Sequence, residues 1–418
     1  MADSKKYGIN TRAIHTQKKF ELPTGDVMPP LHMSTTFENT EPGESEYFYG
    51  RMGNPTREIF ERTIASLEGI EDYENMHGFA MASGMAAVTM IAELIEPGEN
   101  VVITDEVYGG TTRFFSKIAP KRGIEVNFCN FYDTDKLESL INEKTKLVWI
   151  ESPSNPNINL YDISSIAEIV HRNNSILVAD STFSTPFITR PFEHGVDIIM
   201  HSTTKYIGGH GTAVAGSIVD GGNFDWTADP KRQPLFNEPD ASYNGTIWGK
   251  DVPELTGANI PFAVRARVCL LRDLGSACSP DNAFAIIQGL ETVALRMKQH
   301  CANAEYVVNF LKKHKEVTKV IYSTEHEKPI ADRAKQYLKG GNGPMVGIEL
   351  KGGFEAGKKF IESLKMFYHV ANIGDARSLA IHPASTTHSQ LNEKELIASG
   401  VTQSLSLIHI SEPTRPSS

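Results

Sequence analysis

The chain has 418 residues, of which 40% are hydrophobic and 22% are charged, and this composition is typical of a water-soluble protein with two or more packed domains. Its formal net charge is −10 at pH 7 and its lysines and arginines form no dense stripe, which argues against nucleic acid as a partner. The cysteines form no C-x-x-C pair, so we expect packed thiols in a reducing compartment rather than a disulfide framework or a zinc site; they are Cys129, Cys269, Cys278 and Cys301.

The N-terminal part of the chain is predicted to be an arm rather than a domain. Its first residues lead into no apolar stretch of the kind found in signal peptides, so a cytoplasmic location is expected. Residues 1–60 contain several prolines and no sustained periodicity. The nearly uncharged stretch from Gly78 to Leu94 is rich in Gly, Ala, Ser and Met, which favours a buried helix over a membrane span.

Residues 61–280 alternate between short β-rich runs and helical patterns. Between two of these runs, the segment from Asp162 has apolar residues at helical spacing, with Asp162 as the expected N-cap. This alternation predicts βαβ units and a mainly parallel sheet, an α/β fold. The expected strands are 101–104, 124–128, 146–150, 176–179 and 196–200.

The remaining chain is predicted to form a smaller α+β domain. Residues 221–261 are rich in Gly, Pro, Asn and Asp and are too long for an ordinary connection, which indicates a functional loop. Ser279 and Pro280 then have the pattern of a helix start, and the helix is expected to run to about His314. We place the second domain at residues 281–403.

Three segments could carry chemistry, because ligands of open α/β sheets bind beyond the carboxyl ends of the strands. Lys205 follows a strand among hydroxyls and glycines, and a lysine amine can form a Schiff base; alone, it could equally be a solvated lysine. Residues 82–87 form a small-residue turn into a helix, which suits an anion but also close packing. Asp180 ends an apolar strand, where it could pair with a protonated pyridine nitrogen or cap a loop.

The conjunction of these segments resembles the Cys/Met-metabolism enzymes that use pyridoxal 5'-phosphate (PLP), a branch of the aspartate-aminotransferase-like fold type I. The resemblance covers about residues 7–403 and implies that Lys205 carries PLP as a Schiff base, that Tyr108 stacks on its ring and that Asp180 pairs with its nitrogen. It further implies that the cofactor is contacted by Ser83, Gly84, Met85, Asn155, Thr182, Ser202 and Thr204, and that Asn155, Asn372 and Tyr49 contact substrate.

The resemblance also implies a homodimer or homotetramer with shared active sites. Tyr49 and Arg51 look like the pair that the family donates to the PLP phosphate of the neighbouring subunit. From the residues alone, an arginine on an arm is usually a solvated charge, and Tyr49 could pack in a dimer interface.

Within the family, the segments 236–243 and 265–275 resemble the O-acetylhomoserine sulfhydrylases. Gly110 stands where methionine γ-lyase characteristically has a cysteine, and Asn372 also fits the sulfhydrylase pattern. The implied reaction converts O-acetyl-L-homoserine and sulfide to L-homocysteine and acetate, in methionine and cysteine biosynthesis. A methionine or cystathionine γ-lyase, a cystathionine γ-synthase and a catalytically silent PLP-binding homologue stay open.

The chain departs from the family at residues 404–418. There the family has an Arg-Leu-Ser-x-Gly motif whose arginine grips the substrate carboxylate, whereas this chain resembles translated vector or adapter sequence. Arg415 lies between Thr414 and Pro416 in a tail expected to be disordered, and Arg377 and His382 are expected to serve packing rather than to replace the arginine. We therefore expect a non-native tail, set aside from the fold, and a chain that binds PLP but catalyses weakly.

Overall fold

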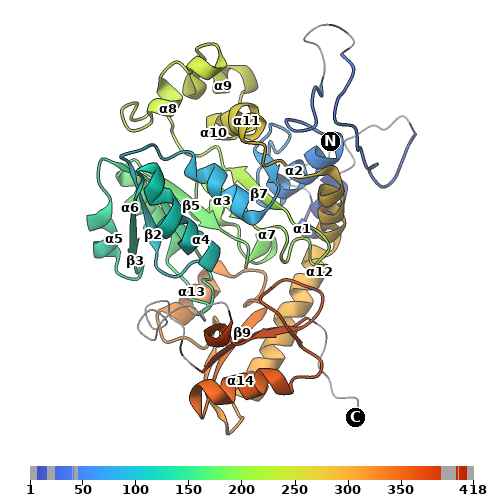
Figure 1. Ribbon diagram of the computed structural model, residues 1–418, viewed down its shortest axis with the longest axis vertical. Helices are drawn as coiled ribbons and strands as arrows, with labels where there is room; N and C mark the ends of the chain where they lie inside the picture. The colour runs from blue at the N-terminus through green and yellow to red at the C-terminus, as the bar shows by residue number, and fades with distance from the viewer. Residues whose placement is uncertain are drawn as a thin grey trace.

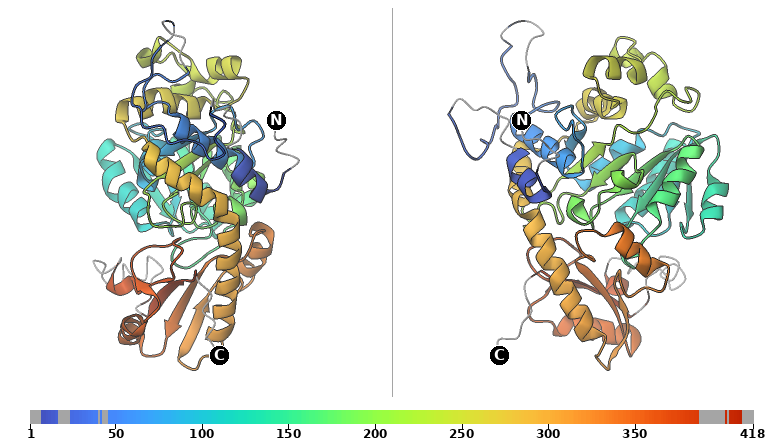
Figure 2. Two further views of the ribbon diagram at one scale, coloured as in Figure 1. Left: turned by 90° about the vertical axis from the view of Figure 1, so that its right-hand side faces the viewer. Right: turned by 180° about the vertical axis from the view of Figure 1, so that it is seen from behind.

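Two β-sheets, joined by one long helix, organise the computed structural model of the protein, which describes residues 7–16, 24–39, 41, 46–386, 402 and 404–411. Figure 1 shows the larger sheet with its helices in the upper part and the smaller sheet below, and Figure 2 shows the helix α12 (Pro280–Leu311) running along both. Arg415 lies outside the described residues.

The larger sheet has seven strands in the order β1-β7-β6-β5-β4-β2-β3. Only β7 runs antiparallel to its neighbours, so the sheet is mainly parallel and the predicted α/β class is confirmed. The strands are β1 (Gly78–Met81), β2 (Asn100–Thr104), β3 (Glu125–Cys129), β4 (Thr145–Glu151), β5 (Ile176–Asp180), β6 (Ile198–His201) and β7 (Gly216–Asp220).

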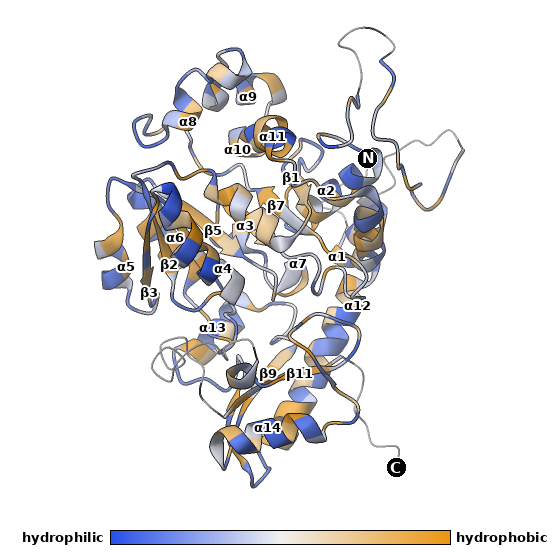
Figure 3. Ribbon diagram, viewed as in Figure 1, coloured by the Kyte–Doolittle hydropathy of each residue, from blue (hydrophilic) through white to orange (hydrophobic). Residues whose placement is uncertain are grey.

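Helices cover both faces of this sheet, which is why its central strands are apolar on both sides. Every residue of β4 and β5 is buried, and Figure 3 shows apolar residues concentrated in these strands. The elements between the strands are α3 (Gly84–Ala92), α4 (Gly109–Arg113), the π-helix η2 (Phe114–Ile118), the 3₁₀ helix η3 (Ala119–Arg122), α5 (Thr134–Leu140), α6 (Ile163–Arg172), α7 (Thr185–Ile188) and η4 (Pro191–His194).

The sequence predicted five of the seven strands and missed two. The stretch from Gly78 to Leu94, interpreted as one buried helix, is instead strand β1 followed by α3. Strand β7 was not expected at all. The cap of α6 is confirmed, because the Asp162 side chain accepts a hydrogen bond from the Ser165 N–H at 3.3 Å. The four cysteines are buried and free, as expected.

The expected functional loop at 221–261 is a helical cap instead. It contains α8 (Pro234–Asn237), η5 (Ala241–Tyr243) and α9 (Trp248–Thr256), and is followed by α10 (Pro261–Arg265), the π-helix η6 (Ala266–Leu271) and α11 (Arg272–Leu274). Trp226, Phe236 and Trp248 are buried in the core of the larger domain, with the rings of Trp226 and Phe236 4.2 Å apart. Burial of these aromatic side chains accounts for the length of the segment.

The N-terminal region also contains helices that the sequence pattern did not indicate. Helix α1 (Ile9–His15) and helix α2 (Pro55–Leu67) both pack on α12. The Asn54 side chain caps α2 by accepting the N–H groups of Thr56 and Arg57. The described residues between these two helices, 24–39, 41 and 46–54, contain no further helix.

The smaller sheet has five strands in the order β10-β11-β12-β9-β8. Helix α12 starts at Pro280, as predicted, but its first half packs with the larger domain around Ile286 and Leu290, and its last turns pack on the smaller sheet around Val308. The remaining elements are β8 (Val317–Ile321), α13 (Ile330–Tyr337), β9 (Met345–Leu350), α14 (Gly353–Ser363), β10 (Tyr368–His369), β11 (Leu379–Ile381), η7 (Pro383–Ser385) and β12 (Leu405–His409).

The structure departs from the sequence interpretation at β12. The interpretation sets residues 404–418 aside from the fold, whereas β12 lies between β9 and β11 and all five of its residues are buried. Leu405 and Leu407 pack on one face of the sheet, and Ile408 packs on the other, toward α12. Apolar residues on both faces suit a central strand, so this segment completes the smaller sheet. Its non-native origin stays a prediction.

No helix among the described residues is long and apolar enough to cross a membrane. Within the same residues, no group of three or more His, Cys, Asp or Glu side chains could hold a metal ion.

Candidate active site

Five site residues lie at or just after the ends of strands, at one edge of the larger sheet. Four of them were predicted from the sequence, and Glu151 was not. Glu151 and Asp180 end β4 and β5, while Lys205 follows β6. Gly84 begins α3 after β1, and Tyr108 precedes α4 after β2. Because these strands are parallel to one another, their carboxyl ends meet at the same edge. The topology therefore gathers segments that are up to 121 residues apart in the chain, counted from 84 to 205.

Lys205 lies where the two domains meet. Its Nζ donates a hydrogen bond to Oδ1 of Asn372, which belongs to the smaller domain. A side chain at Gly374 would place its Cβ 2.5 Å from the Lys205 carbonyl carbon, so this loop lies directly on the lysine segment. Burial lowers the pKa of Lys205, which increases the fraction of neutral, nucleophilic amine.

Asp180 is a buried carboxylate, and burial raises its pKa more than Thr182 and His201 lower it. It accepts a hydrogen bond from the Thr182 N–H at 3.0 Å, and the Thr182 hydroxyl in turn accepts the Ser202 N–H at 2.8 Å. No ion pair involves Asp180 among the described residues, and burial raises its pKa. A buried carboxylate of this kind is stabilised when a cationic group binds next to it.

Glu151 is a second buried carboxyl group at this edge, and the sequence interpretation did not assign it to the site. It lies opposite Asp180 in the register of β4 and β5, and its Oε2 accepts the N–H of Tyr108 at 2.7 Å. Burial, and then the charge of Asp180, raise the pKa of Glu151 well above its ordinary value. Two neighbouring buried carboxylates disfavour each other's ionisation, and this effect adds to that of burial at Glu151.

The start of α3 has the features of an anion site. The Ser83 hydroxyl accepts the Ala86 N–H at 3.0 Å, and no hydrogen bond to the N–H of Gly84 or Met85 occurs within the described chain. Both N–H groups lie at the positive end of the helix dipole. A Cβ at Gly84 would lie 2.6 Å from the Cβ of Ser202, so the helix start and the Ser202 segment form the two sides of one cradle.

Thr204 and Asn155, two further predicted site residues, already form hydrogen bonds with neighbouring residues. The Thr204 hydroxyl donates to the Ala215 carbonyl at 3.1 Å and accepts the Ala215 N–H at 3.0 Å, so its proton is already used. Asn155 lies in the loop after β4, and its backbone N–H bonds to Glu151. The cofactor and substrate contacts of Thr204 and Asn155 therefore stay predictions.

Tyr108 has an exposed ring whose position depends on a glycine. Its side chain is 49% exposed, and a Cβ at Gly110 would lie 2.4 Å from its Cε1 and 3.0 Å from the Met85 Sδ. Any side chain at position 110 would displace the ring or Met85. The glycine at this position thus allows the Tyr108 ring to pack against the start of α4.

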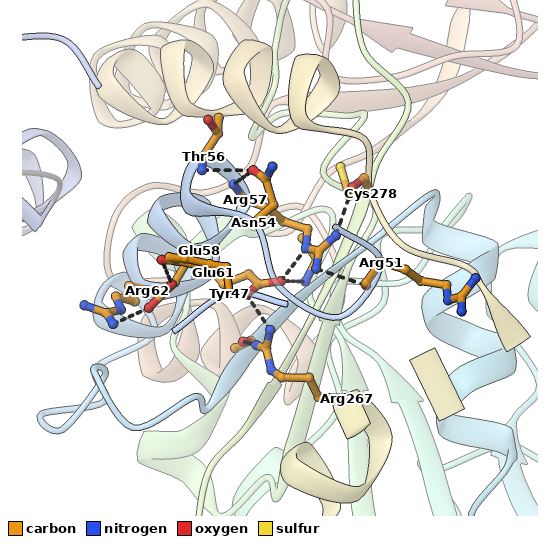
Figure 4. A network of polar contacts seen from close by, with 12 residues as sticks. Tyr47, Arg51, Asn54, Thr56, Arg57, Glu58, Glu61, Arg62, Arg267 and Cys278 are labelled. Carbon is orange, nitrogen blue, oxygen red and sulfur yellow. Dashed lines mark hydrogen bonds and ion pairs between the residues drawn. The ribbon is translucent and has the colours of Figure 1, made fainter. Parts of the chain in front are cut away.

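Tyr49 and Arg51 do not join this cluster in their own chain. Both are exposed, and the Arg51 guanidinium carbon lies 5.0 Å from the centre of the Tyr49 ring. Figure 4 shows Arg51 directed away from a network of polar contacts that holds its backbone. Their predicted role toward the cofactor phosphate of a neighbouring subunit stays a prediction.

The relatives of the chain agree with this site. A family model described as Cys/Met metabolism PLP-dependent enzyme matches residues 10–411, which includes β12. An O-acetyl-L-homoserine sulfhydrylase from Leptospira meyeri is 40% identical, covering 94% of this chain and 90% of the relative. A homocysteine synthase from Schizosaccharomyces pombe is 41% identical, covering 95% and 93%.

A solved structure from Campylobacter jejuni has the same fold. It is described as an O-acetylhomoserine (thiol)-lyase with N'-pyridoxyl-lysine-5'-monophosphate at its position 205. The TM-score is 0.88 at 33% identity, and the match covers 97% of this chain and 96% of that one.

Proposed function

Since the chain belongs to the Cys/Met metabolism PLP-dependent enzymes, we propose that it converts O-acetyl-L-homoserine and sulfide to L-homocysteine and acetate. The observation that carries the proposal is the match, at 40% and 41% identity over more than nine tenths of the chain, to a sulfhydrylase and a homocysteine synthase. The meeting of Lys205, Asp180 and Asn372 at one sheet edge supports it.

The residues at this edge fit PLP. The N–H groups of Gly84 and Met85 have no partner in the described chain and suit a phosphate. Asp180 forms no ion pair among the described residues, and a protonated pyridine nitrogen would supply one. The Lys205 amine, with its lowered pKa, suits covalent attachment. PLP, when bound, supplies an electron sink for negative charge that develops next to the substrate amine.

The residues of the chain then have separate tasks. Lys205 carries the cofactor and, once displaced by the substrate amine, is placed to take and return protons as a general base. Asn372 orients the Lys205 amine through its Oδ1 atom. Glu151 fixes the backbone of Tyr108, whose ring is proposed to cover the cofactor, and Thr182 links Asp180 to the Ser202 side of the cradle.

We also propose that active sites are shared in a homodimer or homotetramer in the cytoplasm. Tyr49 and Arg51 are exposed and lie against each other, which leaves them accessible to the cofactor phosphate of a second copy. Four free, buried cysteines suit a reducing compartment.

Acetate release tests the reaction against its main alternatives. A sulfhydrylase should release acetate from O-acetylhomoserine in step with homocysteine formation, and only when sulfide is present. Acetate and ammonia released without sulfide would indicate a γ-lyase instead. Formation of cystathionine from cysteine, with no reaction of sulfide, would indicate a cystathionine γ-synthase.

Substituting Gly84 with alanine should weaken PLP binding. The new Cβ would lie 2.6 Å and 2.8 Å from the Cβ and Oγ of Ser202, so the helix start must move away from the other side of the cradle. Losing well-aligned hydrogen bonds to a charged group corresponds to roughly a tenfold or greater rise in Kd. Fluorescence titration of the apoprotein with PLP measures this change.

Gly98→Ala is the matched control for that experiment, because Gly98 is also a glycine of the larger domain but has open space around its Cβ position. Its φ of +93° makes a loss of stability expected, without a change in PLP affinity. Equal PLP affinity of Gly84→Ala and the unmodified chain would refute the proposal that the start of α3 and the Ser202 segment bind the phosphate.

We further predict that the chain binds the carboxylate of the substrate weakly. Residues 404–411 contain no lysine or arginine. Leu407 packs beside Phe183 and Ile373, on the face of β12 toward the site, while Arg377 is paired with Asp375 at 3.0 Å. A charge-assisted contact to a carboxylate contributes about 1.5–3 kcal/mol, so its absence should raise KM for O-acetylhomoserine roughly 10- to 150-fold.

The variant Leu407→Arg tests this prediction, since it places a guanidinium on the site face of β12. We expect a lower KM for O-acetylhomoserine at unchanged PLP affinity. Ile408→Arg, on the opposite face toward α12, is the control and should only lower the melting temperature. Turnover of the unmodified chain at micromolar substrate, with no gain from Leu407→Arg, would show that another group binds the carboxylate.

A further inference from the structure

A buried ionic network lies directly behind the exposed pair Tyr49 and Arg51. We call residues 49–53 the arm turn; within it, the Met52 N–H and the Gly53 N–H donate to the Tyr49 carbonyl at 2.9 Å and 3.2 Å. Figure 4 shows Arg57, from the first turn of α2, reaching toward this turn from inside the protein. The proposed reaction gives this network no task.

Arg57 holds the backbone of the arm turn on both sides of the Arg51 Cα. Its Nη1 donates to the Gly50 carbonyl at 2.8 Å, and its Nη2 donates to the Arg51 carbonyl at 3.1 Å. These two carbonyls belong to the two peptide planes that flank the Arg51 Cα, so fixing both fixes the direction in which the Arg51 side chain leaves the backbone. A planar guanidinium can make both bonds at once, whereas a lysine ammonium lacks this fork.

Arg57 is itself held rigidly. Its side chain is 1% exposed, and its Nε lies 3.3 Å from Oε1 of Glu61. The other oxygen of Glu61 bonds to Nη1 of Arg267 at 2.8 Å. Glu61 also accepts the Ala80 N–H at 2.9 Å, and Arg267 donates to the Gly78 carbonyl at 2.6 Å. The network thus ties the arm turn to strand β1, whose carboxyl end leads into the phosphate cradle.

Arg57 is also attached to the segment that leads into α12. Nη1 of Arg57 also donates to the Cys278 carbonyl at 3.4 Å, two residues before α12 begins. A buried guanidinium with an anionic partner and three carbonyl acceptors is costly to rearrange, because each lost partner leaves a buried charge or donor unsatisfied. The arm turn is therefore preorganised before any second copy binds.

We propose that Arg57 is a positioning residue, which orients the arm turn so that Arg51 reaches the cofactor phosphate of a second copy of the chain. The inference rests on the proposed sharing of active sites and assigns to Arg57, which Glu61 holds in place, a task in the site of the neighbouring subunit. Arg57 acts through the Arg51 backbone and does not itself contact cofactor.

A double-mutant cycle on PLP affinity tests the role. Arg51→Ala and Arg57→Lys should each raise the Kd of the apoprotein for PLP, by about tenfold when a charged contact is lost. In the Arg51→Ala background, Arg57→Lys should add less than about a twofold change, because its effect passes through Arg51. Equal effects of Arg57→Lys in both backgrounds would overturn the proposal, since a general structural defect would act independently of Arg51.

Arg267→Lys is the matched control. It disturbs the same Glu61 carboxylate but contacts no atom of the arm turn in the described structure. It should lower the melting temperature about as much as Arg57→Lys and leave the PLP Kd within about twofold of the unmodified chain. A loss of PLP affinity as large as that of Arg57→Lys would contradict a specific role for Arg57.

Mixed oligomers test whether the defect acts on the neighbouring subunit. Lys205→Ala subunits have an intact arm turn, and Arg57→Lys subunits have an intact lysine. Refolding the two together should restore about a quarter of the sites, each with Lys205 from one chain and the arm turn from the other. Recovery with Arg51→Ala but not with Arg57→Lys would overturn only the role of Arg57. No recovery with either would overturn the shared site and this inference together.

Discussion

Replacing Lys205 by alanine is expected to lower kcat/KM for O-acetylhomoserine by about 10³-fold or more. The substitution removes the amine that carries the cofactor and that is placed to move protons at the substrate. The fold should survive, because the only side-chain hydrogen bond that Nζ makes in the described structure goes to Asn372. Steady-state kinetics with purified protein, together with a melting curve, measures both effects.

Lys205→Arg separates the need for an amine from the need for a positive charge. Arginine stays protonated and cannot serve as a nucleophile or base, so this variant should be as inactive as Lys205→Ala. Activity retained in either variant at more than about a tenth of the original value would show that Lys205 is not the cofactor lysine.

Replacing Asp180 by asparagine is expected to lower kcat by about 10²- to 10³-fold, the second-largest effect. The amide keeps the shape and can still accept the Thr182 N–H, but it cannot balance a protonated pyridine nitrogen. Because burial raises the pKa of the Asp180 carboxyl when no cation is bound, pairing with the cofactor should lower that pKa again. In the variant, the pKa of the pyridine nitrogen of bound PLP should be lower, because the carboxylate that stabilises its protonated form is gone.

Asp197→Asn is the control for Asp180→Asn. Asp197 is also a buried carboxylate in this sheet, bonded to His171 at 2.9 Å and to the Leu177 N–H at 2.8 Å, but it precedes β6 at the opposite edge. Its loss should reduce stability and leave the PLP spectrum unchanged. Identical kinetics of Asp180→Asn and the unmodified chain would exclude the proposed pairing.

The sequence predicted the fold class because the class depends on local patterns, and the same patterns pointed to Lys205 and Asp180 as candidates for the site. Apolar runs such as 146–150 mark strands that are buried on both faces, and a carboxylate or lysine at the end of such a run marks the ligand edge. Strand β7 was missed because it follows β6 without an intervening helix and pairs antiparallel with both neighbours. Its partners are distant in sequence, so no local pattern reports them.

The sequence did not indicate several contacts of the site, because they join elements that are far apart in the chain. Glu151 was visible as a strand-end carboxyl, but only the register with Asp180 shows that the two groups share one buried environment. The bond between Lys205 and Asn372 depends on docking of the smaller domain. Arg57 has the sequence pattern of an ordinary helical arginine, and only the fold reveals the carbonyls that it holds.

Strand β12 shows the limit of compositional reasoning. Residues 405–409 were set aside because they do not resemble the family motif, yet their alternation of buried faces fits the gap between β9 and β11. Strand formation requires only β-propensity and apolar side chains, whereas substrate binding requires a particular charge. The segment therefore completes the smaller sheet but does not supply the expected arginine.

The absorbance spectrum of the purified protein with PLP, recorded before and after O-acetylhomoserine and then sulfide, tests the account most directly. We predict a visible band from cofactor bound to Lys205, a shift of this band when millimolar O-acetylhomoserine is added, and homocysteine only after sulfide. A band that does not respond to the substrate at any concentration, or homocysteine formation in the Lys205→Ala variant, would contradict it.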